Sequence, residues 1–219
     1  MHFEILVEDQ SGKRALDILV PKIIGTEHSF KVHPYKGVGR IPKNLRGTTE
    51  PNSRILLDQL PKLLQGYGNA FGSYPLDYPA AVILVCDLDD KCLKVFREEL
   101  CRILHACNPQ PKTCFCLAIE EGEAWFLGDL PAIKAAYPKA KDMVLNAYVN
   151  DSICGTWEHL ADAVYPGGSQ KLSAQGWQQI GAEKSVWAER ISPKMDVKNN
   201  HSPSFSYFCQ KLRELAGMV

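Results

Sequence analysis

Apolar residues in the first 120 positions gather in short strand-like segments, and the stretches between them have helical spacing. Residues 3–7, 80–86 and 113–119 are apolar runs, and Phe30, Val32 and Pro34 alternate with polar residues over 30–34. Short apolar runs bounded by turn residues are typical of buried strands, and apolar positions three and four apart predict helices over 11–24, 53–64 and 91–107. Strands that alternate with helices predict an α/β fold, with about four mostly parallel strands in a three-layer core.

The pattern changes beyond residue 140. Short helices are predicted near 156–164, 182–191 and 204–215, separated by turns rich in glycine, proline and serine, and no strand signal of similar strength occurs there. A segment rich in glycine, tyrosine and proline, 66–79, predicts a loop before the third strand. The domain prediction is therefore an α/β core over 1–137 and a helical C-terminal extension over 138–219, packed on the core.

Carboxylates follow three of the four predicted strands. Glu8 follows the first strand, Asp87, Asp89 and Asp90 follow the third, and Glu120, Glu121 and Glu123 follow the fourth. Because the carboxyl ends of parallel strands meet at one edge of a sheet, these side chains are expected to converge in one crevice. Clustered carboxylates repel one another and are relieved by a raised pKa or by a divalent cation, which predicts a Mg²⁺ or Mn²⁺ site.

The expected metal ligands are Glu8, Asp87, Asp89, Glu123 and Glu120, and the expected catalytic residues are the first four of these. Glu123 is favoured among the glutamates because it opens the helix after the fourth strand, although the sequence does not separate it from Glu120 and Glu121. Simpler interpretations stay open. Aspartates after a strand also cap helices, Glu8 can pair with a lysine, and surface glutamates can face solvent.

These residues carry a resemblance to a known family. A strand ending in Glu8 and a later strand ending in Asp87-Leu88-Asp89 resemble the toprim domain of topoisomerases, primases and the overcoming-lysogenization-defect nucleases. Asp9 departs from the pattern, since glycine is usual after the glutamate. The remaining chain looks like an uncharacterised bacterial family, the domain of unknown function numbered 4276. The resemblance implies a toprim-like, Rossmann-like core in which Asp87 and Asp89 hold the metal and Glu8 holds it or transfers protons.

The resemblance also implies a divalent-metal-dependent nuclease or phosphotransfer enzyme acting on nucleic acid, DNA more than RNA, in bacterial defence against phage. A basic loop carries Lys36, Arg40, Lys43 and Arg46, and Lys184 lies on a later helix, so these five residues are the expected nucleic-acid contacts. The alternative for each is an ordinary solvated side chain. No phosphate-binding GxxxxGK[ST] loop is present, so any dependence on ATP requires an ATPase partner.

Two rival functions fit the same motifs. Asp-x-Asp after a strand also holds a metal on a sugar diphosphate, so a nucleotide-sugar transferase is one rival, although it gives Glu8 no role. A catalytically silent toprim-like module that binds a partner protein is the other. Substitution of Glu8 separates the two enzymes, because it should abolish nuclease activity and spare transferase activity.

Composition adds limits rather than a function. The 25 basic and 25 acidic residues balance, so a polyanion would need a local basic patch. The eight cysteines include no CxxC pair, and the chain opens on a strand pattern, so reduced cysteines in a cytoplasmic protein are expected rather than disulfides or a zinc site at Cys107, Cys114 and Cys116. No apolar stretch is long enough to span a membrane.

Overall fold

Four parallel strands form one sheet in the computed structural model, which describes residues 1–42, 54–75, 77–151 and 154–218. The strands are β1 (His2–Val7), β2 (Ser29–Pro34), β3 (Ala80–Asp87) and β4 (Thr113–Ala118), in the order β2-β1-β3-β4. Ile5 pairs with both Val32 and Ile83, and Leu84 pairs with Phe115. The α/β class and the parallel sheet are confirmed, and every strand lies within two residues of its predicted ends.

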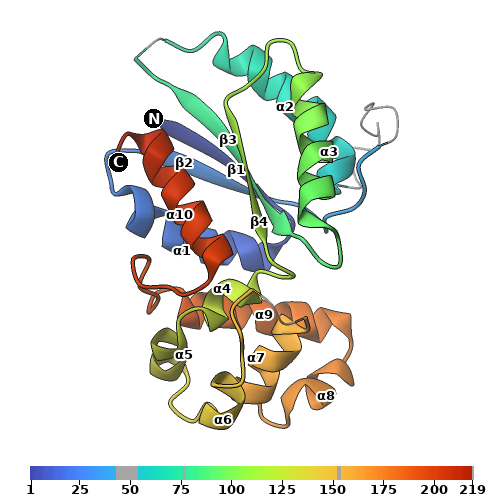
Figure 1. Ribbon diagram of the computed structural model, residues 1–219, viewed down its shortest axis with the longest axis vertical. Coiled ribbons are helices and arrows are strands. Elements are labelled where there is room, and N and C mark those ends of the chain that lie inside the picture. Colours follow the sequence, from blue (N-terminus) through green and yellow to red (C-terminus); the bar gives the residue numbers. More distant parts are fainter. Residues whose placement is uncertain (43–53, 76, 152–153, 219) are drawn as a thin grey trace.

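Helices cover both faces of this sheet, which makes the core three-layered (Figure 1). On one face, α1 (Gln10–Ile24) and α10 (Pro203–Ala216) pack against Phe3, Ile5 and Val7. On the other, α2 (Leu56–Phe71) and α3 (Leu93–His105) pack against Leu6 and Leu84. Successive strand residues point to opposite faces, so β1, β3 and β4 each contribute to both hydrophobic clusters, whereas β2 contributes Phe30 and Val32 to one of them.

Six further helices form a lobe beyond the carboxyl ends of the strands (Figure 1), called the helical lobe below. They are α4 (Glu123–Leu127), α5 (Leu130–Ala136), α6 (Asp142–Leu145), α7 (Thr156–Val164), α8 (Gly168–Ser173) and α9 (Trp177–Ile191). The chain leaves the sheet after β4, forms the lobe and returns through α10, which lies beside β4. The segment 138–219 is thus helical where described, and its last helix belongs to a layer of the core; the boundary at 137 stays a prediction.

Helix α2 extends further than the sequence predicts. It ends at Phe71 instead of residue 64, and it begins at Leu56, whereas the predicted start at residue 53 lies outside the described residues. Two of the glycines that indicated a loop, Gly66 and Gly68, lie within the helix. A Cβ at Gly68 would lie 2.0 Å from the carbonyl oxygen of Pro109, so glycine there lets α2 approach the loop before β4.

No helix within the described ranges is long and apolar enough to cross a membrane. All eight cysteines are free thiols, and four of them, Cys86, Cys107, Cys116 and Cys209, are buried among apolar side chains. These four act as small hydrophobic residues of the core.

Candidate functional site

Three of the predicted carboxylates meet around one small cavity between the sheet and the helical lobe. The cavity measures about 50 Å³, and its lining includes Glu8 after β1, Asp87 at the end of β3, Glu123 at the start of α4 and Lys184 on α9. Apolar side chains such as Val85 and Trp125 complete the wall. Residues that are far apart in the sequence are therefore brought together where the parallel strands end.

The turn after β1 fixes the position of Glu8. Its carbonyl oxygen accepts a hydrogen bond of 2.8 Å from the Gly37 N–H, which ties it to the loop after β2. The next residue, Asp9, caps α1 by accepting 2.7 Å from the Gly12 N–H. Asp9 thus does the work of a helix cap where the toprim pattern has glycine. Gly12 has no room for a side chain, since a Cβ would lie 2.5 Å from a methyl group of Val7.

Glu8 and Asp87 are directly coupled. The Asp87 N–H donates a hydrogen bond of 3.3 Å to the Glu8 carboxylate. Burial, with the negative charges of Asp9 and Asp89, raises the pKa of Glu8 to about 7. Burial and the charge of Glu8 raise the pKa of Asp87 well above its usual range, and Lys184 offsets only part of this shift. Neither carboxylate has enough positive charge nearby to ionise at its ordinary pH.

Lys184 reaches the site from α9. Its Nζ lies 3.0 Å from a carboxylate oxygen of Glu123 and 3.1 Å from one of Glu121, and its side chain is only 15% exposed. Burial lowers the pKa of the Lys184 ammonium, but the charges of Glu123, Glu121 and Asp87 outweigh this and raise the pKa overall. Burial also raises the pKa of Glu123, against the effect of Lys184. Lys184 is therefore a charged, inward-facing residue, in contrast to the solvated alternative.

The charges around the cavity do not balance. Glu8, Asp87, Glu121 and Glu123 face one another with Lys184 as the cation among them. Within the described parts of the chain, no three His, Cys, Asp or Glu side chains are spaced to hold a metal ion as they lie. Lys184 engages two of the four carboxylates, so a cation would bind only after these side chains turn toward it.

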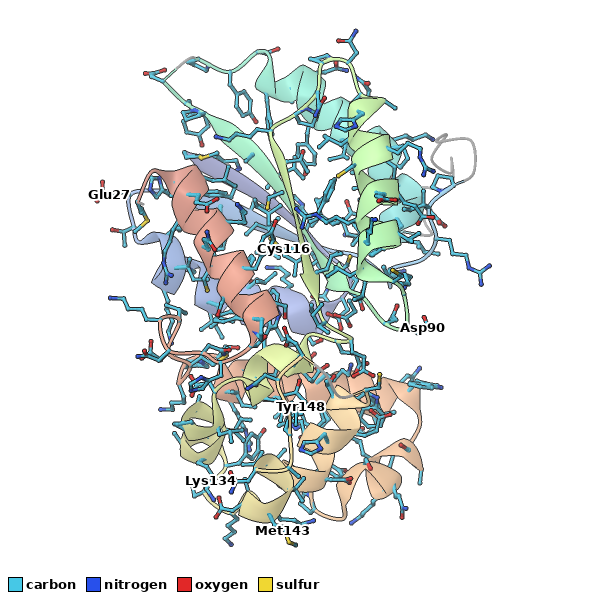
Figure 2. The ribbon with its side chains drawn as sticks, in the orientation of Figure 1. Glu27, Asp90, Cys116, Lys134, Met143 and Tyr148 are labelled. Carbon is cyan, nitrogen blue, oxygen red and sulfur yellow. The ribbon has the colours of Figure 1, made fainter. Side chains whose placement is uncertain are left out.

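Asp89 is not part of this group. It sits in the turn after β3 with a φ of +51°, and its carboxylate pairs with Lys91 at 2.6 Å. Its side chain is 45% exposed. Asp90 lies at the outer end of the same turn, away from the cavity (Figure 2). Of the Asp-x-Asp pair, only Asp87 lines the cavity.

Glu120 and Glu121 hold the start of α7. The Glu120 carboxylate accepts hydrogen bonds from the N–H groups of Gly155 and Thr156, the latter at 3.0 Å. Glu121 accepts from the Thr156 hydroxyl at 3.0 Å and from the Trp157 N–H at 3.2 Å. Carboxylates at a helix N-terminus satisfy free N–H groups and complement the helix dipole. The sequence left Glu121 open as an alternative to Glu123 and Glu120, and the structure places it at Lys184 and at the start of α7.

Two of the basic residues expected to contact nucleic acid, Lys36 and Arg40, belong to the described residues and lie outside the cavity. Lys36 and Arg40 are exposed on the loop that follows β2, next to the Gly37 that binds the main chain of Glu8. Arg40 also donates its N–H to Asp58 at 3.2 Å. Lys43 and Arg46 lie outside the described residues. The loop therefore places positive side chains at the same edge of the sheet as Glu8.

Fold and site together define a class: an α/β protein with a Rossmann-like parallel sheet and an acidic cavity at the carboxyl ends of its strands. The chain belongs to the family described as Domain of unknown function (DUF4276), whose model matches residues 7–213. That match begins at the last residue of β1 and covers the other three strands, the helical lobe and most of α10. No curated protein and no solved structure matches the chain.

Proposed function

We propose that this protein is a divalent-metal-dependent nuclease with a toprim-like core. The observation that carries the proposal is the meeting of Glu8, Asp87 and Glu123 around one cavity, with raised pKa values and Lys184 as the cation among them. Such an excess of buried carboxylate is unfavourable by itself and is relieved by a bound divalent cation. Perturbed groups of this kind cluster at functional sites.

The donor set fits Mg²⁺ or Mn²⁺. Both ions prefer oxygen ligands, and Mg²⁺ commonly takes one or two carboxylates with several waters. Asp87 and Glu123 would hold the ion, and the cavity of about 50 Å³ has room for an ion with some of its waters. When bound, the ion neutralises charge on a phosphate and lowers the pKa of a bound water. Lys184 would then be free to contact a phosphate oxygen.

Glu8 is suited to accept a proton. A carboxyl with a pKa of about 7 is ionised in part near neutral pH and still basic enough to deprotonate an attacking water. Its hydrogen bond from the Asp87 N–H holds one carboxylate oxygen in place at the wall of the cavity. The chain thus separates two roles, with Asp87 and Glu123 as ligands and Glu8 as the general base.

Nucleic acid is the proposed substrate, with DNA favoured over RNA. Lys36 and Arg40 lie at the same edge of the sheet as Glu8, where they can contact phosphates on either side of the cleaved bond. Bacterial defence in the cytoplasm, with an ATPase as partner, comes from the resemblance alone. The sequence holds no phosphate-binding loop of its own for that step.

A cleavage assay tests the proposal. The purified protein is incubated with single- and double-stranded DNA and with RNA, with Mg²⁺, Mn²⁺ or EDTA. We expect metal-dependent cleavage that is lost in Glu8→Gln, Asp87→Asn and Glu123→Gln. Glu27→Gln is the matched control, since Glu27 is exposed in the turn between α1 and β2, at one side of the molecule and away from the cavity (Figure 2). Cleavage that survives EDTA, or that persists in Asp87→Asn, contradicts the proposal.

One observation favours a silent binding module instead. Lys184 already bridges Glu121 and Glu123, which is what a purely structural ion-pair network would contain. Calorimetric titration with Mn²⁺ separates the two functions, because a silent module needs no metal and would give no heat at millimolar Mn²⁺. The nucleotide-sugar transferase is less well supported, since it uses Asp87 and Asp89 together and Asp89 pairs with Lys91 outside the cavity.

A further inference from the structure

A second cavity lies along the outer edge of β4 and is separate from the acidic site. It measures about 440 Å³ and runs between α3 and α10. Its floor is Phe115, Leu117 and Ile119, and its walls include Leu93 on α3 and Tyr207 on α10. Figure 1 shows β4 between these two helices, with no ribbon in front of it. This cavity is called the β4 groove below.

Backbone groups of β4 point into this groove. β4 is the last strand in the sheet order, and its even-numbered residues bond to β3: Lys112 accepts from the Val82 N–H at 2.8 Å and Ala118 from the Leu88 N–H at 3.0 Å. In a parallel ladder the residues between them turn the other way, so the N–H and C=O groups of Phe115 and Leu117 face outward. No described strand pairs with them. An unpaired strand edge is a template for another extended chain.

Only a short chain end fits against this edge. Arg97 on α3 donates a hydrogen bond of 3.3 Å to the Tyr207 hydroxyl on α10, and its guanidinium lies 5.7 Å from the centre of the Tyr207 ring. This contact crosses from one helix to the other and closes the groove beside the start of β4. Pairing along the whole strand, as between the sheets of two molecules, is therefore blocked. A peptide whose chain ends at Arg97 can still pair with the rest of β4.

The charge at the closed end selects which chain end binds. Arg97 is exposed and has no described carboxylate partner, so its guanidinium can take a carboxylate in a two-pronged contact. A peptide antiparallel to β4 would bring its C-terminus to Arg97 and Tyr207. At the open end, the buried side-chain oxygen of Asn150 has no hydrogen-bond partner and is free to accept an N–H.

We propose that the β4 groove binds the C-terminal segment of a partner protein, added to the sheet as a fifth strand with its carboxylate on Arg97 and Tyr207. Alternate residues of this segment face opposite sides of the sheet. Residues turned toward α3 meet Leu93 and Leu117 and are apolar. Residues turned toward α10 meet Ser204 and Tyr207 and are small or polar. The occupant is thus a short, alternating, extended C-terminus, and its binding does not depend on the acidic site.

NMR with ¹⁵N-labelled protein tests this inference. The probe is the peptide acetyl-Thr-Val-Ser-Val-Thr-Val with a free carboxylate, titrated to millimolar concentration, and its C-terminal amide is the comparison. We expect the amide signals of Phe115, Leu117 and Ile119 to move with the free acid, and affinity to fall about tenfold or more with the amide. Arg97→Gln should cause the same loss. Arg102→Gln, an exposed arginine of α3 that does not line the groove, should cause none.

Three results overturn the inference. If the β4 signals do not move with either peptide, the groove is not a strand-binding site. Equal affinity for acid and amide would remove the role of Arg97 as a carboxylate anchor. Movement of the same signals on raising the protein concentration, without peptide, would show that a second copy of the chain occupies the groove. Thermal unfolding of each variant checks that it is folded before titration.

Discussion

The main-chain N–H of Asp87 donates a hydrogen bond to the side chain of Glu8, so the ends of β1 and β3 are joined through a carboxylate. This bond is available whether Glu8 is ionised or neutral, because a protonated carboxyl keeps an oxygen that accepts. The geometry of the pair therefore survives titration of Glu8. The free energy of the folded state does change on titration, because the charged form of Glu8 is buried beside other acids.

Glu8→Gln should stabilise the protein at alkaline pH. Native Glu8 holds its proton up to about pH 7, whereas the unfolded chain releases it near pH 4.5. Between these values the native state binds more protons, so stability falls as pH rises, and all of the loss is present above pH 7. Glutamine does not titrate and still accepts from Asp87. Urea unfolding should show a gain of about 1 to 3 kcal/mol at about pH 8 and almost none at about pH 4. An equal gain at both values, or one matched by Glu27→Gln, contradicts this prediction.

Lys184→Met should destabilise the protein and make its stability depend on divalent ions. The change leaves Glu121 and Glu123 facing each other without a buried cation, and loss of one partner of a buried pair costs about 3 kcal/mol. Mn²⁺ should restore part of this in unfolding experiments. Lys13→Met is the control, because Lys13 pairs with Asp17 on the surface and should cost less than about 1 kcal/mol. Equal costs for the two variants would show that the Lys184 contacts are weak.

Asp87→Asn and Asp89→Asn should behave differently although they are two residues apart. Asp87 lines the cavity, so Asp87→Asn should weaken Mn²⁺ binding by about tenfold or more. Asp89 pairs with Lys91 at the surface, so Asp89→Asn should change both Mn²⁺ affinity and stability very little. Isothermal calorimetry measures both affinities. Equal losses in the two variants would place Asp89 at the ion and restore the full Asp-x-Asp motif.

Cleavage of nucleic acid should have an acid limb controlled by Glu8. Because Glu8 accepts a proton only when ionised, kcat/KM should rise with pH and then level off. The apparent pKa should lie below the value of about 7 that Glu8 has without the ion, since a bound cation favours the ionised carboxylate. Initial rates across about pH 5 to 9 give this profile. Glu8→Gln should abolish cleavage and, in any residual activity, the rise of the rate with pH. A flat profile with full activity would assign the proton transfer to another group.

Two glycines of α2 should respond in opposite directions to alanine. A Cβ at Gly68 collides with the Pro109 carbonyl, so Gly68→Ala should cost about 1 to 3 kcal/mol. Gly66 has nothing within 4 Å of the same position, so Gly66→Ala should gain about 0.5 to 1 kcal/mol from helix propensity. Urea unfolding of both variants measures the pair. A loss in both would mean that α2 is not helical at these positions.

Hydrophobic patterning predicted β1, β3 and β4 because these strands are short apolar runs buried by helices on both faces. In β2 only Val32 is buried, and alternation of Phe30 and Val32 was the signal. The helix 156–164 was placed correctly at both ends, since its apolar spacing is bounded by Gly155 and Tyr165. The end of α2 was wrong, because Gly66 and Gly68 look like loop residues until the approach of Pro109 is known. Helices as short as α6 leave too few apolar positions for a period to appear.

Within the site, strand ends predicted that Glu8, Asp87 and Glu123 would lie together, since the parallel strand order brings these residues to one edge of the sheet. Side-chain partners decided the rest, and no pattern in the sequence encodes them. Asp89 turns to Lys91, and Glu120 turns to the start of α7. Lys184 was singled out for phosphate, yet its reach toward Glu123 depends on how α9 packs on α1.

The return of the chain through α10 gives Lys184 an advantage over dissolved ions. Since the helical lobe is attached to the sheet at both of its ends, the ammonium is delivered to Glu121 and Glu123 as an intramolecular partner with a high effective concentration. A sodium or potassium ion offers the same single charge without that tether and cannot displace it. Under the proposed function, a divalent ion brings twice the charge to the same carboxylates. The tethered Lys184 ammonium would then make the acidic cavity favour Mg²⁺ or Mn²⁺ over monovalent salt.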